Sequence, residues 1–265
     1  MTGVPLEITG LTKIFETPAG PYVAVKDVDV KMRDGEFVCI VGHSGCGKST
    51  VLSIIAGLQK ATFGGVAING KQVDEPGSDR GVVFQSPCLL PWLSAGENVA
   101  LAVGRAFPEH TRAQRRSQAE KYLELVGAAG CYEQKPAELS LGLQQCVSMA
   151  RALSIDPRFL LLDEPFSMLD SLTRLDLQDK LLDVWEKSRK VVVMVTHDID
   201  EALYLADRII LMTDGPEARV GETYTVPFER PRKRNEVLDH PEYYACRSYL
   251  VDFLENHAKQ FAHQL

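Results

Sequence analysis

The stretch GHSGCGKST, residues 42–50, decides the fold of this chain. It follows the apolar run FVCIV and precedes the helix-like VLSIIAGL. Glycines let successive backbone N–H groups curl around phosphate oxygens, and the following helix directs its positive dipole end at the same point. The pattern G-x-x-x-x-G-K-[ST] in this strand–loop–helix context predicts a phosphate-binding loop composed of Gly42, His43, Ser44, Gly45, Cys46, Gly47, Lys48, Ser49 and Thr50.

Three members of this loop have distinct expected roles. Lys48 is predicted to reach the β- and γ-phosphates, and the Ser49 hydroxyl to bind Mg²⁺. Because Cys46 lies inside the loop, we expect thiol alkylation to block nucleotide binding and Mg-ATP to protect against it. An ordinary glycine-rich turn is the alternative for the bare pattern, and the flanking strand and helix argue against it.

Polar residues end three later apolar runs. Asp163 ends FLLLD and is expected to deliver a carboxylate to Mg²⁺, and Glu164 to orient or deprotonate the attacking water. His197 follows VVVMVT and is expected to contact a γ-phosphate. Gln85 follows GVVF and is expected to bind Mg²⁺ or to position water. Each residue alone is ordinary at a strand end, and the upstream phosphate loop favours the joint role.

The hydrophobic pattern predicts an α/β fold. PLEITGLTKIF and VKDVDVKM alternate like half-buried antiparallel strands, whereas FVCIV, GVVFQ, FLLLDEP and VVVMVTHD are buried runs suited to a sheet covered by helices. Between the second and third buried runs lie roughly 75 residues of helical period, which predicts an inserted helical lobe over about 86–157. Beyond residue 215 the chain is proline-rich and charged, and then helix-like.

Composition excludes several classes of protein. The chain has 265 residues, 45% of them hydrophobic, and a net charge of -7, so it can build one generous core and does not suit nucleic-acid binding. No secretion signal opens it, and no apolar run approaches the roughly 18 residues of a bilayer span. Six cysteines without paired spacing indicate free thiols in a reducing compartment rather than disulfides or zinc ligands.

The phosphate loop, Gln85, LSLGL (139–143), Asp163, Asp170 and His197 resemble, in order and spacing, the nucleotide-binding subunits of ABC transporters. The resemblance covers about residues 6–215. It implies a P-loop NTPase with a RecA-like core, an antiparallel β-subdomain and the helical subdomain, in an ATPase domain of residues 1–215 with a C-terminal extension, 216–265, packed on the core. It also implies ATP and Mg²⁺ as cofactors, adenine stacked on Phe15, and two such chains dimerised head to tail, with Asp170 and LSLGL at the nucleotide.

LSLGL departs from the family's LSGGQ. Ser140 and Gly142 remain for a γ-phosphate across the dimer, but Leu141 replaces a glycine and Leu143 a polar residue. We expect Leu141 to lack glycine's freedom at positive φ and to add bulk near the phosphate. The sequence therefore predicts a heterodimer with a second ATPase chain that has the better signature segment. A regulatory subunit that binds ATP and scarcely hydrolyses it is the alternative.

Leu89, Leu90, Pro91 and Trp92 form an apolar cluster beside Gln85, where the family docks its membrane partner. Packing of Trp92 against the helical lobe is the alternative. LLPWL and the C-terminal tail resemble the importer subfamily for nitrate, bicarbonate, taurine and aliphatic sulfonates, nearest to nitrate and bicarbonate ATPase subunits. The resemblance implies a peripheral subunit on the cytoplasmic face of the inner membrane, with permease subunits as partners and a solute-binding protein as an indirect one.

Nitrate is the expected ion, ahead of bicarbonate, cyanate and taurine or sulfonate. Soluble ABC proteins of translation or DNA repair are disfavoured, because they join two cassettes or carry a long coiled coil, and this chain has one phosphate loop and no heptads.

Overall fold

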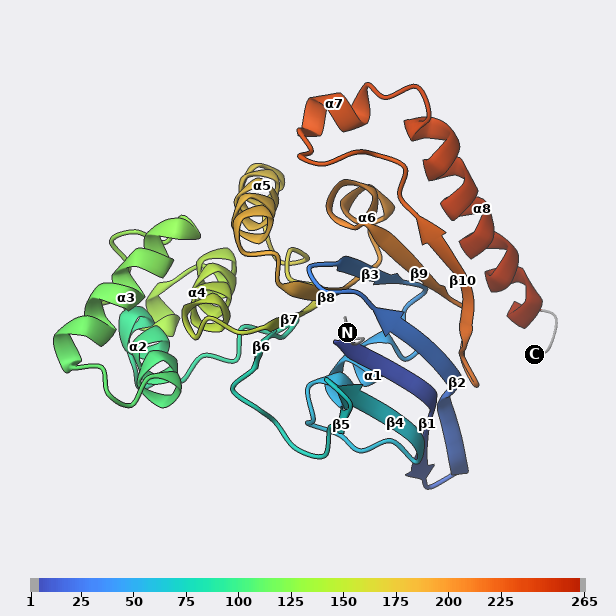
Figure 1. Ribbon diagram of the computed structural model, residues 1–265, viewed down its shortest axis with the longest axis horizontal. Helices are drawn as coiled ribbons and strands as arrows, with labels where there is room; N and C mark the ends of the chain where they lie inside the picture. The colour runs from blue at the N-terminus through green and yellow to red at the C-terminus, as the bar shows by residue number, and fades with distance from the viewer. Residues whose placement is uncertain (1–4, 263–265) are drawn as a thin grey trace. The chain divides into compact units, whose positions relative to one another are not determined.

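The computed structural model describes residues 5–262, with side chains described through Asn256. The chain forms two compact units (Figure 1). The first unit comprises residues 1–77 and 191–265, and the second comprises 78–190. Within residues 5–262, no helix combines the length and apolar character needed to cross a bilayer.

The first unit contains the predicted antiparallel sheet, in the order β2-β1-β4-β5. Its strands are β1 (Leu6–Thr17), β2 (Gly20–Met32), β4 (Phe63–Ile68) and β5 (Lys71–Gln72). In β1, the apolar residues Leu6, Ile8 and Leu11 are buried, and the polar residues between them are more exposed. The alternation in the sequence thus corresponds to one face on the core and one toward solvent.

A second set of strands in the first unit runs in the order β10-β9-β3-β8. These are β3 (Phe37–Val41), β8 (Val191–Thr196), β9 (Arg208–Met212) and β10 (Val220–Thr225). β3 pairs in parallel with β8 and β9, while β10 pairs antiparallel with β9. All residues of β3 and β8 are buried, as expected for strands with both faces covered.

Helices of the first unit pack on these strands. α1 (Lys48–Ile55) lies against β8, β2 and β4, and α6 (Ile199–Leu205) lies against β3 and β8. α7 (Arg234–Leu238) and α8 (Tyr243–Ala262) follow β10, and α8 contacts α6. The sequence predicted neither β9 nor β10. Only pairing with β9 makes a strand of VGETYT, because its side chains are half-buried or exposed.

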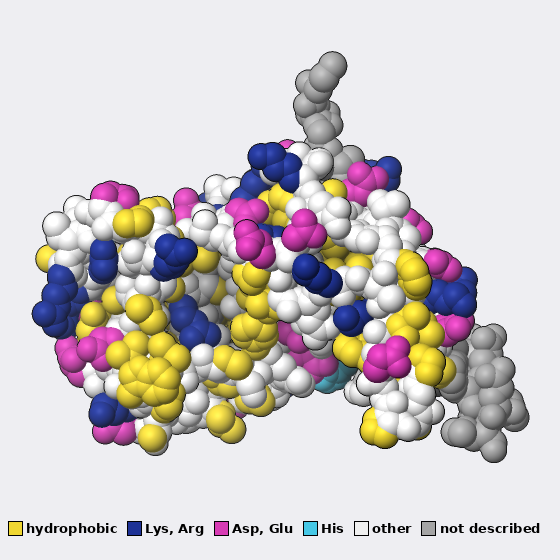
Figure 2. All heavy atoms as spheres, turned by 90° about the horizontal axis from the view of Figure 1, so that it is seen from below, with side chains coloured by type: hydrophobic (Ala, Val, Ile, Leu, Met, Phe, Trp, Pro, Cys, Tyr) yellow, Lys and Arg dark blue, Asp and Glu magenta, His cyan; other side chains and the backbone are white. Residues whose placement is uncertain are grey.

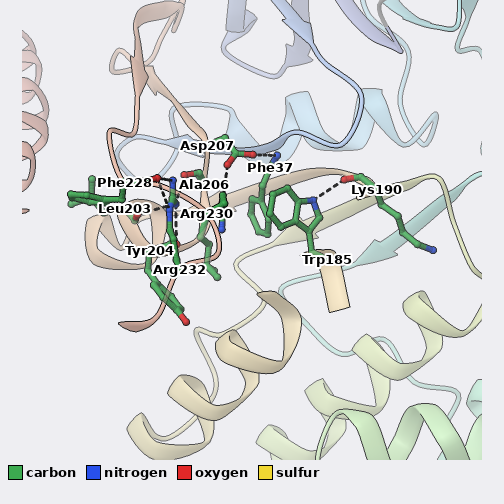
Figure 3. Close-up of polar contacts among 11 residues, drawn as sticks. Phe37, Trp185, Lys190, Leu203, Tyr204, Ala206, Asp207, Phe228, Arg230 and Arg232 are labelled. Atoms are coloured by element: carbon green, nitrogen blue, oxygen red, sulfur yellow. Dashed lines mark hydrogen bonds and ion pairs between the residues drawn. The ribbon is translucent and has the colours of Figure 1, made fainter. Parts of the chain in front are cut away.

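Arg230 and Arg232 fasten the segment after β10 to the C-terminal end of α6 (Figure 3). Arg230 binds a carboxylate oxygen of Asp207 at 2.9 Å, and the other carboxylate oxygen accepts the backbone N–H of Phe37 at 3.0 Å. Arg232 is only 7% exposed. Its guanidinium donates to four backbone carbonyl oxygens, those of Leu203, Tyr204, Ala206 and Phe228. Positive charge at a helix C-terminus is stabilising, so Arg232 helps to end α6.

In the second unit, β6 (Arg80–Val83) pairs in parallel with β7 (Phe159–Asp163). The stretch between them is helical, as predicted, with α2 (Ala95–Ala106), α3 (Arg112–Leu125), the short η1 (Pro136–Glu138) and α4 (Leu141–Ser154). α2, α3 and α4 pack on one another. α5 (Ser171–Ser188) follows β7. Near the end of α5, the Trp185 indole N–H donates to the carbonyl oxygen of Lys190, which lies just beyond the helix, at 2.8 Å (Figure 3).

Candidate nucleotide-binding site

The predicted phosphate loop connects β3 to α1, and Gly47 is the N-cap of that helix. Gly45 and Gly47 have φ of 82° and 87°, in the left-handed region that favours glycine. A Cβ on Gly47 would lie 2.4 Å from the Val25 Cγ1 atom, so this position also has no room for a side chain. Left-handed residues that alternate with ordinary ones turn backbone N–H groups toward one centre, which is the geometry of an anion-binding loop.

Lys48 lies inside this loop and is only 5% exposed. Its ammonium donates to the carbonyl oxygens of Gly42 and His43, each at 2.7 Å, and lies 3.8 Å from the Cys46 Sγ atom. The loop thus holds a positive charge against its own carbonyl groups. Because the Lys48 side chain is flexible, its ammonium can leave these two carbonyl oxygens and turn to an anion while the backbone stays in place.

Cys46 is buried, at 1% exposure. Burial raises the pKa of its thiol above the ordinary value of 9.0, and the nearby Lys48 ammonium opposes that shift less strongly. A buried thiol with little thiolate reacts slowly. The expected alkylation must therefore be slower at Cys46 than at Cys88, which is exposed.

His197 lies at the end of β8 with an exposed side chain. The turn that carries it is fixed by Thr196, which is 2% exposed. The Thr196 hydroxyl donates to the Glu201 carboxylate at 2.8 Å and accepts the Asp198 backbone N–H at 3.0 Å. Asp198 in turn caps α6. The imidazole is thus presented by a rigid strand end rather than by a loose loop.

Phe15 lies in β1, half-buried, with the Lys13 ammonium 5.0 Å from its ring centroid. Directly opposite it in β2 is Tyr22, which the sequence analysis missed. Opposite residues of an antiparallel pair share a face of the sheet. A Cβ built on Gly215 would lie 3.3 Å from the Tyr22 hydroxyl and 3.4 Å from the Gly45 carbonyl oxygen, so Tyr22 and the phosphate loop both lie beside Gly215. The sequence did carry a signal for this pair: if Pro18 and Ala19 form the hairpin turn, Phe15 and Tyr22 are the third pair of residues outward from it.

The second unit brings together Gln85 and Glu164. The Gln85 side-chain amide donates to the Glu164 carboxylate at 3.1 Å. Asp163 is the last residue of β7, and Glu164, directly after it, has φ of 44°. A left-handed φ at a non-glycine residue is strained, and such strain gathers at functional sites. The side chains of Asp163 and Glu164 are both half-buried.

The site residues are thus divided between the two units. Ser49, like the rest of the phosphate loop and His197, belongs to the first, whereas Gln85 and Asp163 belong to the second. The hydroxyl, amide and carboxylate of Ser49, Gln85 and Asp163 all offer oxygen, the ligand atom that Mg²⁺ prefers. The set therefore fits Mg²⁺ by its chemistry.

Comparison with known proteins shows the family of this chain. The sequence profile described as "ABC transporter" matches residues 25–167, more than half of the chain. The chain belongs to the ABC transporter family.

This ABC chain is similar to curated ATP-binding proteins over nearly its whole length. It is 50% identical to the nitrate import ATP-binding protein NrtD of Synechococcus elongatus, over 95% of the chain and 90% of that protein. It is 48% identical to the bicarbonate transport ATP-binding protein CmpD of a Synechocystis strain, over 97% of the chain and 90% of that protein. It is also 48% identical to the nitrate import ATP-binding protein NrtC of Synechocystis, over 94% of the chain and 37% of that longer protein.

A solved structure of the same fold is the ATP-binding cassette MJ0796, a dimer in a post-hydrolysis state bound to ADP and Pi. The TM-score is 0.77 at 34% identity, covering 84% of this chain and all of that one. The predicted fold class, a P-loop ABC ATPase, is therefore confirmed.

In this ABC chain the signature segment LSLGL begins α4. Ser140 is the N-cap, and its hydroxyl accepts the Leu143 backbone N–H at 3.2 Å. Glycine's freedom at positive φ is not needed here, because Leu141 and Gly142 lie in the first turn of a helix and neither is among the positive-φ residues of the described chain. LSLGL therefore differs from LSGGQ at Leu141 in side-chain bulk. That bulk lies at the surface, because Leu141 is 58% exposed.

Two further residues of α4 in the ABC chain fasten the segment that carries Gln85. Gln145 is completely buried, and its amide donates to the Phe84 carbonyl oxygen at 3.0 Å. The Arg151 guanidinium donates to the carbonyl oxygens of Pro87 and Cys88 at 3.1 and 2.9 Å. No sequence spacing indicated these contacts, because they join segments more than sixty positions apart.

Asp170 is the N-cap of α5, and its carboxylate accepts the backbone N–H groups of Leu172 and Thr173 at 3.2 and 3.1 Å. Hydrogen bonds from Thr173, its side chain first, lower the pKa of this carboxyl group, with the Leu172 N–H contributing less. In the ABC chain Asp170 therefore fixes the start of α5. The short segment 165–169 connects Glu164 to this helix start.

Proposed function

We propose that this chain is the ATP-hydrolysing subunit of an ABC importer that carries a small inorganic anion, with nitrate or nitrite first. The observation that carries this proposal is the glycine-shaped loop around Lys48, in a chain 50% identical to a nitrate import ATP-binding protein over 95% of its length. Bicarbonate is the second candidate, supported by the 48% identity to CmpD. Cyanate and taurine or sulfonate rest on sequence resemblance alone.

In the proposed reaction, residues 42–50 bind the triphosphate, and Lys48 exchanges its carbonyl contacts for β- and γ-phosphate oxygens. Glu164 orients the attacking water and accepts its proton, while His197 contacts the γ-phosphate. Ser49, Gln85 and Asp163 are the residues that would hold Mg²⁺, which would supply positive charge against the phosphates when bound.

The hydrogen bond between Gln85 and Glu164 orients the proposed proton acceptor. The Gln85 amide donates to one carboxylate oxygen of Glu164 and so restricts the direction of that side chain. The other carboxylate oxygen can accept the proton of the attacking water. Gln85 thereby links the segment next to Trp92 to the proton acceptor.

The active assembly is proposed to be a head-to-tail heterodimer with a second ATPase chain, peripheral on the cytoplasmic face of the inner membrane. The partner's signature segment completes this chain's site, whereas Ser140 and Gly142 serve the partner's nucleotide less well beside the exposed Leu141.

The proposed ATPase domain comprises residues 1–215, with the helical subdomain at about 86–157 and a C-terminal extension at 216–265. A solute-binding protein delivers the ion to the permease.

The permease is proposed to dock on the second unit near Trp92, which is 68% exposed. A groove of about 320 Å³ begins at the neighbouring Leu93, and its lining includes the apolar Leu101 and the basic Arg112, Arg115 and Arg116. Figure 2 shows apolar side chains at the surface of the α2–α4 part, at the left of the view, with basic side chains among them. Exposed apolar area of this kind favours a docking surface over internal packing of Trp92.

The test is reconstitution of this chain with its permease and second ATPase in liposomes, followed by uptake of labelled nitrate and by single-turnover ATP hydrolysis. Glu164→Gln should abolish uptake and reduce hydrolysis by about 10²–10⁴-fold, the usual contribution of a general base. Trp92→Ala should weaken assembly with the permease and leave Mg-ATP binding by the separate chain unchanged. Full uptake with Glu164→Gln would refute the proposed role of this chain.

A second candidate function is a regulatory subunit that closes on ATP and scarcely hydrolyses it. The exposed Leu141 at the signature segment favours it, and the presence of Glu164 and Lys48 argues against it. The same Glu164→Gln experiment separates the two, since unchanged single-turnover hydrolysis in the complex identifies the regulatory role.

A further inference from the structure

Helix α8 makes polar contacts with two separate parts of the first unit. Near its N-terminal end, the Tyr243 hydroxyl and the Arg247 guanidinium both donate to one carboxylate oxygen of Asp200, at 2.7 and 2.8 Å. Asp200 lies in the first turn of α6, three residues after His197. This end of α8 therefore holds the turn that presents His197.

Further along, α8 contacts the phosphate loop itself. The His43 Nε2 atom lies 3.1 Å from the Leu254 carbonyl oxygen. A carbonyl oxygen only accepts, so the imidazole must carry its proton on Nε2 for this bond to form. The two residues are 211 positions apart in the chain, and His43 is an exposed residue at the tip of a loop.

Between these two contacts α8 is firmly seated. Tyr243, Cys246 and Leu250 are at most 5% exposed and recur at helical spacing. A Cβ on Gly221 of β10 would lie 2.6 Å from the Phe253 ring, so the helix and the strand are in close contact there. Figure 1 shows α8 running alongside β10. A helix buried along one face moves as a single body, so a constraint at one end is felt at the other.

We propose that α8 is a strap that positions the phosphate loop and the His197 turn together, with His43 as the positioning residue of the loop. The proposal rests on the proposed function, because it concerns the same nucleotide. The physical basis is preorganisation: a loop already held in its binding conformation loses less conformational entropy when the ligand binds. His43 acts through the loop backbone and need not touch the nucleotide.

The first experiment measures Mg-ATP affinity of the full chain by calorimetry. His43→Ala removes the donor and should weaken binding about two- to tenfold, the range of one net hydrogen bond. His43→Gln can donate at a similar reach and should recover most of the affinity. The matched control is Tyr249→Phe, which removes a hydrogen bond from α8 to Glu222 of β10 and leaves both strap contacts in place. It should bind like the parent chain.

The second experiment tests the strap without any nucleotide. Tyr243→Phe combined with Arg247→Ala frees Asp200 but changes nothing that touches the loop. If α8 is a strap, hydrogen–deuterium exchange of the amides at 43–47 should rise in this double variant, and not in Tyr249→Phe. Unchanged exchange at the loop would overturn the proposal and leave two independent local contacts.

The outcomes also separate the strap from the proposed function. If the parent chain binds no Mg-ATP, the proposed function fails whatever α8 does. If the parent chain binds Mg-ATP and His43→Ala binds it equally well, the function stands and the strap is refuted. Equal loss in His43→Ala and His43→Gln would also refute it, because the donor would not matter.

Discussion

Gly47→Ala and Gly45→Ala form a matched pair that tests the geometry of the phosphate loop. Both glycines have nearly the same left-handed φ, 87° and 82°. A Cβ on Gly47 would lie 2.4 Å from the Val25 Cγ1 atom and 3.4 Å from the Ala24 carbonyl oxygen, whereas a Cβ on Gly45 meets nothing within 4 Å. The two variants therefore share the backbone strain and differ in the steric contact.

The magnitude follows from that difference. An alanine at left-handed φ costs about 1–2 kcal/mol, and alanine in place of glycine restricts the unfolded chain, which returns about 0.4–1 kcal/mol. Both terms are common to the two variants. Overpacking against Val25 adds about 1–3 kcal/mol to Gly47→Ala alone. Gly47→Ala should therefore be less stable than Gly45→Ala by about 1–3 kcal/mol, or roughly 2–12 °C in Tm.

The assay is calorimetric or circular-dichroism melting of the full chain, with Mg-ATP binding measured in parallel. Fluorescence suits it poorly, because both tryptophans, Trp92 and Trp185, lie in the second unit and the loop lies in the first. Gly47→Ala should also bind Mg-ATP more weakly, because α1 starts at the next residue and must shift with it. Equal Tm values for the two variants would refute the close contact between Gly47 and Val25.

Three further predictions concern other parts of the chain. Arg232→Met should lower stability by about 3–5 kcal/mol, because four buried carbonyl oxygens lose a charged donor; a Tm within a degree of the parent would contradict this. In a Cys88→Ser background, the alkylation rate of Cys46 should still climb above about pH 10, roughly one unit above the ordinary thiol pKa of 9.0, where an ordinary thiol has levelled off. The reason is that burial raises the pKa of the Cys46 thiol, so its thiolate forms at higher pH; a plateau reached by about pH 10 would contradict this. Tyr22→Ala should weaken ATP binding by about 1–3 kcal/mol, the value of one base–aromatic contact, and leave tripolyphosphate binding unchanged, as should Phe15→Ala; an equal effect on both ligands would place Tyr22 at the phosphates only.

The sequence by itself determined the parts of this protein whose signal is contiguous. The phosphate loop, the buried strands and the acidic pair Asp163–Glu164 were read correctly as local structure, because strand, turn and helix are coded within a few residues of one another. The Ser140 start of α4 was readable for the same reason, since an N-cap bonds to the N–H three residues later. The sequence analysis missed β9 and β10; the half-buried and exposed residues of β10 become a strand only beside β9.

Only the tertiary structure decided which distant residues meet. The order of residues in the chain does not indicate that His43 contacts Leu254, that Tyr22 and Gly45 both lie beside Gly215, or that Arg232 ends α6. It also decided the backbone at Leu141, which lies in the first turn of α4 and has no left-handed φ. The physical reason is common to all four cases: hydrogen bonding and packing act over a few ångströms in space, whereas sequence patterns report only neighbours along the chain.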